Sequence, residues 1–235
     1  MPNHHHLRLH PLVLSLLVAC GAGASLPAMA GVTCDLYDGD PATEDNGGAD
    51  TGTQDDRTMA CGSGAVAGLV ATAIGTNAEA TGRASVALGY DSHATGSATI
   101  AIGTRAMATG AWSFAIGEGS KSSDWGAIAL GVNSNATGQF SAASGVYSQA
   151  TGENSMALGG FLGTSSTNVD SFRFTQATAA RAIAIGNGEQ AQPEEGVALG
   201  IMTRVLAGAD RAVAIGSDSI ASEADTLSFG HLASD

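Results

Sequence analysis

Short apolar phrases recur along this chain at a fixed interval of fourteen residues. Each phrase, such as "VALG" at 86–89 or "IAIG" at 100–103, alternates aliphatic residues with alanine and ends in glycine. A period of two places the aliphatic side chains on one face of a strand and the alanine on the other. The pattern therefore predicts one short strand per repeat. The glycines that close these strands in register are Gly75, Gly89, Gly103, Gly117, Gly131, Gly145 and Gly159.

The second half of each repeat predicts another short strand. In "SHATG" at 92–96 a variable residue, His93, stands beside a small one, Ala94, and the phrase ends in a second glycine. The variable position is chemically unrelated from repeat to repeat, so we expect it to face solvent. Its other members are Glu79, Met107, Lys121, Asn135 and Gln149.

Two such strands joined by glycine turns make one flat coil, since glycine adopts positive φ at little steric cost. Roughly a dozen coils, with two strands of about five residues each, would stack with strands in parallel register. The predicted fold is therefore an all-β parallel solenoid over residues 58–230. Glycine every seventh residue argues against helix.

The pattern leaves open which face of the strands lines the coil interior. If the aliphatic residues point inward, the alanines lie outside and allow several chains to pack closely. If the alanines point inward, the aliphatic residues form the contact between subunits. Both arrangements predict a chain that oligomerises.

The phrase "SVALGxxSxATG" and its variants resemble the head repeats of trimeric autotransporter adhesins, the YadA-like family. The resemblance covers roughly residues 58–230. It implies a left-handed parallel β-roll that forms a homotrimer and binds host matrix proteins or cell surfaces. This handedness opposes the right-handed preference of ordinary parallel crossovers.

The lattice is interrupted between Gly159 and Gly186, which are 27 residues apart, one short of two repeats. We expect a loop near 160–176 to protrude from the stack. The loop carries Phe172 and Phe174, and two interpretations are open: a recognition surface, or packing against a neighbouring subunit.

Aromatic residues cluster at a second place in the lattice. Trp112 and Phe140 occupy the same repeat position two coils apart, with Gly126 between them and Trp125 one residue before it. Exposed tryptophan often marks a binding site. The alternative is that Trp125 fills the space that Gly126 leaves.

The N-terminus has the features of an export signal. Residues 1–30 contain a short apolar segment and end in "AMA", which predicts cleavage between Ala30 and Gly31. A lipobox-like "LVAC" ending at Cys20 is an alternative that would place a lipid on this cysteine. Either route takes the protein out of the cytoplasm.

Residues 31–57 form an acidic leader. Eight acidic residues and no basic one lie between Asp35 and Asp56. Because an oxidising compartment favours disulfides, we expect Cys34 to pair with Cys61 and to tether the leader to a degenerate first coil. Two free thiols are the alternative.

The C-terminal phrase "DTLSFG" at 225–230 resembles the end of the family's head, and a short tail follows at 231–235. The sequence contains no heptad stalk and no membrane anchor. Two hypotheses follow: a free-standing adhesin head, or a truncated or split passenger that depends on a separately encoded stalk and anchor and has no adhesive role of its own. The expected location is the cell surface, the outer membrane or the medium, and the periplasm if no anchor is supplied.

No reactive constellation stands out. Beyond the export signal only His93 and His231 remain, and the P-loop-like "GEGSKS" has Ser120 in place of the required glycine before Lys121. We therefore expect no enzyme activity, no cofactor and no metal site. A net charge of −13 argues against nucleic acid as a partner.

Overall fold

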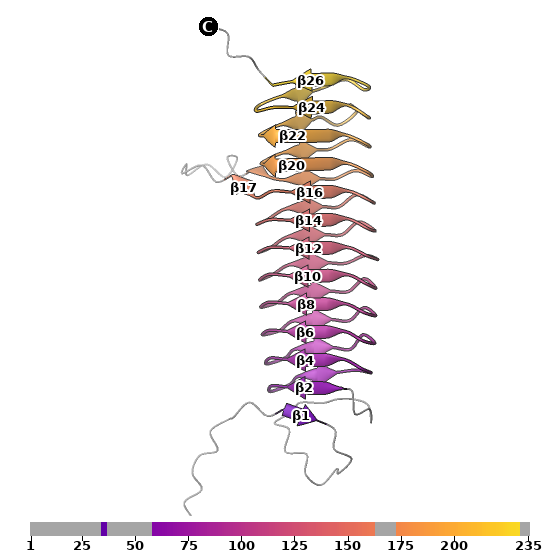
Figure 1. The fold of residues 1–235 in the computed structure, drawn as a ribbon, viewed down its shortest axis with the longest axis vertical. Coiled ribbons are helices and arrows are strands. Elements are labelled where there is room, and N and C mark those ends of the chain that lie inside the picture. The colour runs from indigo at the N-terminus through magenta and orange to yellow at the C-terminus, as the bar shows by residue number, and fades with distance from the viewer. Residues whose placement is uncertain (1–33, 37–57, 163–172, 231–235) are drawn as a thin grey trace, which may run out of the picture. The chain divides into compact units, whose positions relative to one another are not determined.

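The computed structural model describes the backbone of residues 34–36, 58–162 and 173–230, and the side chains of residues 58–160 and 174–230. Every regular element in these ranges is a β-strand. That part of the chain accordingly holds no helix long and apolar enough to cross a membrane. The strands stack as coils that contribute in turn to two long sheets (Figure 1). The predicted all-β parallel solenoid is confirmed.

The larger sheet has 13 strands and the smaller one 11, and in both the spatial order follows the chain. The larger sheet consists of β1 (Cys34–Leu36), β2 (Met59–Cys61), β4 (Thr72–Ile74), β6 (Val86–Leu88), β8 (Ile100–Ile102), β10 (Phe114–Ile116), β12 (Ile128–Leu130), β14 (Ala142–Ser144), β16 (Met156–Leu158), β20 (Ile183–Asn187), β22 (Val197–Ile201), β24 (Val213–Ile215) and β26 (Leu227–Phe229). The smaller sheet consists of β3 (Val66–Ala67), β5 (Glu79–Ala80), β7 (His93–Ala94), β9 (Met107–Ala108), β11 (Lys121–Ser122), β13 (Asn135–Ala136), β15 (Gln149–Ala150), β19 (Gln176–Ala177), β21 (Gln190–Ala191), β23 (Arg204–Val205) and β25 (Ile220–Ala221). β17 (Phe161–Leu162) and β18 (Arg173–Phe174) form a separate antiparallel pair.

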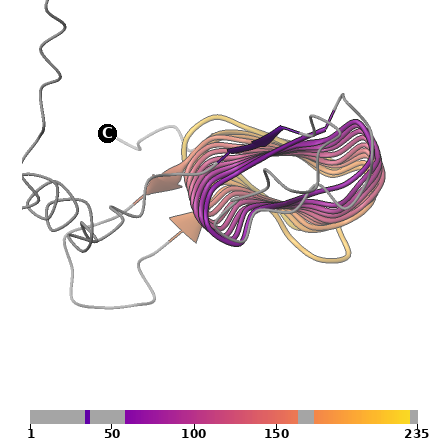
Figure 2. The ribbon, with the colours of Figure 1, turned by 90° about the horizontal axis from the view of Figure 1, so that it is seen from below.

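Equivalent residues of successive repeats lie directly opposite one another. Ala87 pairs with Ala101 in the larger sheet, and Ala94 pairs with Ala108 in the smaller one. Most strands have three residues in the larger sheet and two in the smaller, so the predicted five-residue strands are wrong except at β20 and β22. The turns take up the rest of each repeat, and Figure 2 shows the resulting flat coils superposed along the stack.

The two corners of a coil use glycine differently. Gly117, after β10, has φ = 132°, and a Cβ there would lie 2.4 Å from the carbonyl oxygen of Gly131 in the next coil. At the second corner a Cβ on Gly96 would lie 2.5 Å from Gly110 O, but this glycine is not among the residues with positive φ. The positive φ falls two residues later, on Ala98 at 55°. At that corner glycine is needed for close stacking, and the expectation of positive φ there is wrong.

Alanine fills the coil interior. From β2 to β24, the central residue of every three-residue strand is a buried alanine, and so is the second residue of most two-residue strands, for example Ala115 and Ala108. A coil with such short strands holds its two sheets close together, so small side chains fill most of the space between them. Hydroxyl groups complete the interior near the corners: Ser85 Oγ donates to Gly82 O at 2.6 Å, and such a bond satisfies a buried polar group.

The open question of orientation is therefore decided in favour of alanine inside. The aliphatic residues of the larger sheet, such as Val86 and Leu88, point outward and remain partly exposed. The variable positions of the smaller sheet also point outward, as predicted.

The interruption after Gly159 leaves the lattice in register. Gln149 pairs with Gln176, and Ala157 pairs with Ala184, as if the intervening residues were absent. The extra chain leaves the stack through the antiparallel pair of β17 and β18. The insertion thus starts and ends at one corner of one coil.

The first coil meets an antiparallel strand at its outer edge. β1 pairs with β2 such that Cys34 lies opposite Cys61. Cys61 is disulfide-bonded and occupies the position that Ile74 holds in the next coil. β1 thereby covers the backbone of β2 that would otherwise be an open sheet edge.

Candidate binding surface

An aromatic stack runs along one edge of the solenoid, at the corner that precedes each strand of the larger sheet. The ring centroids of Trp112 and Trp125 are 4.7 Å apart, and those of Trp125 and Phe140 are 4.8 Å apart. The second pair is edge-to-face, which is a favourable aromatic geometry. The three side chains come from three successive coils and lie in one column.

The backbone at this edge brings the rings together. Trp112 and Phe140 have left-handed φ values of 55° and 53°, and Gly126 occupies the same position in the coil between them with φ = 64°. A Cβ on Gly126 would lie 2.8 Å from Phe140 Cδ1, so the ring of the following coil already occupies that space. Trp125, from the preceding position, joins the two outer rings.

Both interpretations of the aromatic residues hold in part. The space over Gly126 is filled by the ring of Phe140, yet Trp112, Trp125 and Phe140 remain 54%, 37% and 47% exposed. The left-handed φ is a property of this corner, since Ala98 and Asn154 share it at 55° and 54°, so the exposed rings alone distinguish this stretch of the edge. We therefore take these three side chains, which we call the aromatic edge, as the candidate binding surface.

The phenylalanines of the insertion do not join the aromatic edge. Phe174, on β18, lies with its ring 5.5 Å from that of Tyr147. Tyr147 belongs to the opposite corner of the coil, after the larger sheet, where it has φ = 58°. Phe172 lies outside the described residues. The residues predicted as one candidate surface therefore occupy two edges.

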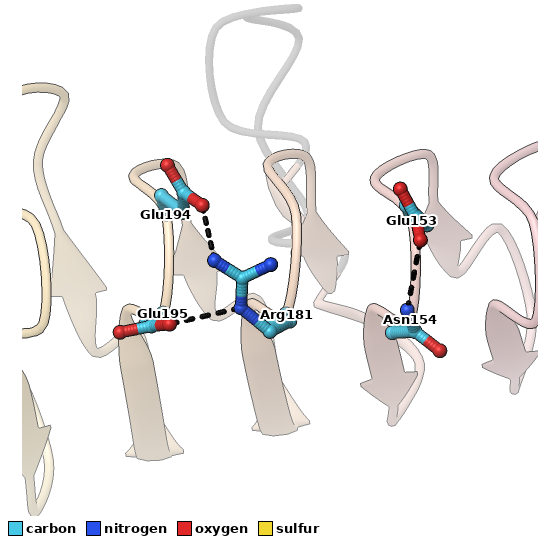
Figure 3. Close-up of polar contacts among 5 residues, drawn as sticks. All are labelled: Glu153, Asn154, Arg181, Glu194 and Glu195. Carbon is cyan, nitrogen blue, oxygen red and sulfur yellow. Dashed lines mark hydrogen bonds and ion pairs between the residues drawn. The ribbon is translucent and has the colours of Figure 1, made fainter.

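Beyond Phe140 the same edge becomes charged. Arg181 forms ion pairs with Glu194 and Glu195 of the next coil (Figure 3), and Arg211 binds Asp225 through two hydrogen bonds of 2.6 and 2.8 Å. The hydrogen bond from Arg211 lowers the pKa of Asp225, and the hydrogen bond to Glu195 raises the pKa of Arg181. These pairs join successive coils on the surface.

The apolar outer face of the larger sheet is the surface that the sequence offers as the contact between subunits when alanine points inward. This face carries two ranks of mostly aliphatic side chains, interrupted at Thr72 of β4 and at Ala142 and Ser144 of β14. We call it the aliphatic face. Its members include Ile74, Ile102, Ile116, Leu130, Met156, Ile185 and Ile215.

Apart from the exposed ion pairs of Arg181 and Arg211, histidine has one carboxylate neighbour among the described side chains. His93 lies on the smaller sheet with Nε2 3.6 Å from Glu79 Oε2. No group of three or more His, Cys, Asp or Glu residues within residues 58–160 and 174–230 could hold a metal ion. The geometry of these residues thus offers surfaces for contact.

Comparison with known protein families gives a repeated match. The model of the YadA head domain repeat matches residues 71–92, 80–106, 94–120, 108–134, 126–148, 136–161 and 207–233. A search of curated proteins gives no match. The matched segments cover half of the chain and follow the same coils that the structure stacks. The chain therefore belongs to the YadA head domain family, the head repeats of trimeric autotransporter adhesins.

Proposed function

We propose that this protein is an exported, non-enzymatic adhesin head that attaches cells to host extracellular matrix or to other cell surfaces. The observation that carries the proposal is the match of head repeats to coils that stack in one continuous register. The stack presents its side chains along extended edges and faces, so contact is distributed along a surface.

The head acts as a homotrimer in this proposal, with coils wound in the left-handed sense of its family. The aliphatic face supports the assembly, because an extended apolar surface of this kind marks a protein interface. The outer face of the smaller sheet carries Glu79, Lys121 and Gln149 at equivalent positions and suits exposure to water. Three subunits would bring the aliphatic faces together around one axis.

In this proposal, the ligand binds to surfaces that remain exposed to solvent in the trimer. The aromatic edge supplies side chains of the type that dominate binding interfaces. Three copies of this edge would add avidity to a modest single contact. The ligand class in this proposal is a matrix protein or another component of a cell surface.

The proposal also includes export of the chain and attachment of its acidic leader to the first coil. The signal peptide is removed between Ala30 and Gly31, and Cys34 is the partner of Cys61 in the disulfide. The backbone pairing of these two cysteines supports this disulfide. It would hold the acidic leader at the first coil, and a separately encoded stalk and anchor would display the head.

The test is binding by the purified mature chain to immobilised matrix proteins and to intact cells. We expect Trp112→Ser combined with Phe140→Ser to weaken binding by about tenfold or more, since truncating central aromatic contacts commonly costs over 1 kcal/mol. The matched control is Tyr90→Ser, which removes an aromatic ring exposed on the opposite corner.

Two outcomes would count against the proposal. Equal binding by the double variant and the control would remove the aromatic edge from adhesion. Absence of binding to every surface, by a chain that is folded and trimeric, would favour the alternative of a passenger subunit without an adhesive role.

A further inference from the structure

Among the described side chains, one carboxyl group lies inside the alanine and serine core. Glu189, just before β21, is fully buried, at 0% exposure. Neighbouring coils place only small side chains at its position, which immediately precedes each strand of the smaller sheet. The equivalent residues are Ala78, Ser92, Ala106, Ser120, Ser134, Ser148, Thr175, Thr203 and Ser219.

Glu189 contacts the residue that ends the insertion. Its Oε2 lies 3.2 Å from Thr175 Oγ1, and its Oε1 has no hydrogen-bond partner. Thr175 Oγ1 also lies 2.9 Å from Gly186 O and 3.0 Å from Gly160 O. Gly160 and Thr175 flank the insertion, so this hydroxyl connects its two ends with Glu189.

The number of protons at this site decides the state of the carboxyl. A threonine hydroxyl has one proton to donate and two lone pairs to accept. Thr175 Oγ1 accepts from the backbone N–H of Gly188 at 3.3 Å, and three oxygens surround its one proton. If the proton goes to Gly160 O, the bond that joins the two ends of the insertion, an ionised Glu189 faces Thr175 with no hydrogen between the two oxygens. A neutral Glu189 supplies that hydrogen and uses the second lone pair of Thr175.

We propose that Glu189 is the neutral acid in the folded head and donates its proton to Thr175 Oγ1, and that ionisation of Glu189 loosens the base of the insertion. The site is then a proton-dependent clamp. Loss of the proton leaves a buried charge beside the Thr175 hydroxyl, with Oε1 still unpaired. The insertion at residues 160–175 is therefore anchored best in mildly acidic surroundings.

Charged neighbours do not offset the buried charge. The strands β19, β20, β21 and β22 contain no charged or titratable residue. β23 carries Arg204, which alternates with the buried Thr203 and Val205 and so belongs to the outer face. Arg173 of β18 has a side chain outside the described residues. Burial is the main cause that raises the pKa of Glu189, opposed in part by the nearby backbone N–H of Glu189, the Thr175 hydroxyl and the backbone N–H of Asn187.

Because the pKa of Glu189 is raised in the folded state, its contribution to folding stability decreases as the pH rises. Because the folded head holds the proton more tightly than the unfolded chain, the stabilisation is complete below the ordinary glutamate pKa of 4.5. It is lost as the pH rises through the higher pKa of the folded state. Glu189 thus opposes the usual acid denaturation of a protein rich in carboxylates.

The test compares Glu189→Gln with the parent chain by thermal unfolding from pH 4 to pH 8, at fixed protein and salt concentration. Glutamine keeps the shape and supplies a donor without a charge. We expect the variant to unfold at a temperature about 2–4 °C higher than the parent at pH 8, with the difference vanishing toward pH 4. Glu223→Gln, an exposed glutamate, is the control and should follow the parent. Equal pH profiles for the parent and Glu189→Gln would overturn the proposal.

Hydrogen exchange locates the effect and excludes a bound cation. After correction for the intrinsic pH dependence of exchange, amides of residues 175–189 should lose protection as the pH rises in the parent and keep it in Glu189→Gln. Unfolding of the parent at pH 8 is also measured in calcium chloride, in sodium chloride and in choline chloride of the same ionic strength. If calcium or sodium raises the unfolding temperature more than choline does, and Glu189→Gln shows no such rise, a cation neutralises Glu189. The proton clamp would then be wrong.

Discussion

The two sheets of the solenoid share one core but differ in what they present outward. Both turn alanine inward, as Ala115 and Ala108 do. Outward, the larger sheet carries the aliphatic face, while the smaller sheet carries Glu79, His93, Lys121 and a run of amides. The inward residues and the glycines build the stack. The outward residues do not take part in it and are therefore free to specify what each side contacts.

The largest effect should come from a change that damages both sheets at once. Gly117→Ala places a Cβ 2.4 Å from Gly131 O at φ = 132°. We expect a loss of roughly 2–6 kcal/mol from backbone strain and overpacking together. Chemical denaturation monitored by circular dichroism measures it.

Gly160→Ala is the control for this prediction. Its added Cβ would meet only Asn187 Oδ1, at 3.6 Å, and we expect a change within about 0.5 kcal/mol. Similar losses for both variants would show that the corner position itself has no special requirement.

A substitution confined to one outer face tests whether the outer faces of the two sheets have different roles. Ile116→Glu on the aliphatic face should dissociate the trimer, because an unpaired charge in an interface costs about 3–5 kcal/mol. Met107→Glu on the smaller sheet replaces a residue of equal exposure, 39% in both cases, and should leave the trimer intact. Light scattering coupled to size-exclusion chromatography gives the mass of each.

The outcome can contradict the assignment of faces directly. If Met107→Glu yields monomers and Ile116→Glu yields trimers, the smaller sheet is the interface. A parent chain that is a stable, folded monomer would remove the trimer altogether.

The smallest expected effect on stability comes from the ion pair of Arg211 and Asp225, which lies on the charged part of the edge between the two sheets. Because Arg211 lowers the pKa of Asp225, this pair stabilises the fold above the ordinary aspartate pKa of 3.8, and the contribution is lost as the pH falls through the lower folded value. Both side chains are exposed, so we expect only a slight shift in unfolding temperature.

Arg211→Gln should therefore make the decline in unfolding temperature between pH 5 and pH 3 shallower than in the parent. Asp218→Asn, on the opposite corner, should leave the decline unchanged. A decline of the same steepness in Arg211→Gln and the parent would show that the pair adds nothing to the stack.

Much of the fold could be predicted because a repeat multiplies a weak local signal. One "VALG" phrase is ambiguous, but seven glycines in register determine the coil length and the pairing of Ala87 with Ala101. Strand length was overestimated, because a period of two does not reveal where a turn begins. The same register predicts that Trp112 and Phe140 lie in one column. The position of Phe174 on a separate edge could not be predicted, because it depends on where the insertion leaves the stack.

The sequence by itself determined the parallel stack, its corners and its membership in the head family, because these depend on spacing alone. Only the tertiary structure decided that alanine faces inward, since that choice depends on how closely two sheets approach across a coil. It also decided the environment of Glu189. In the sequence this residue is one of 22 acidic residues; in the fold the turn at Gly188 places its carboxyl inside the coil, where burial changes its chemistry.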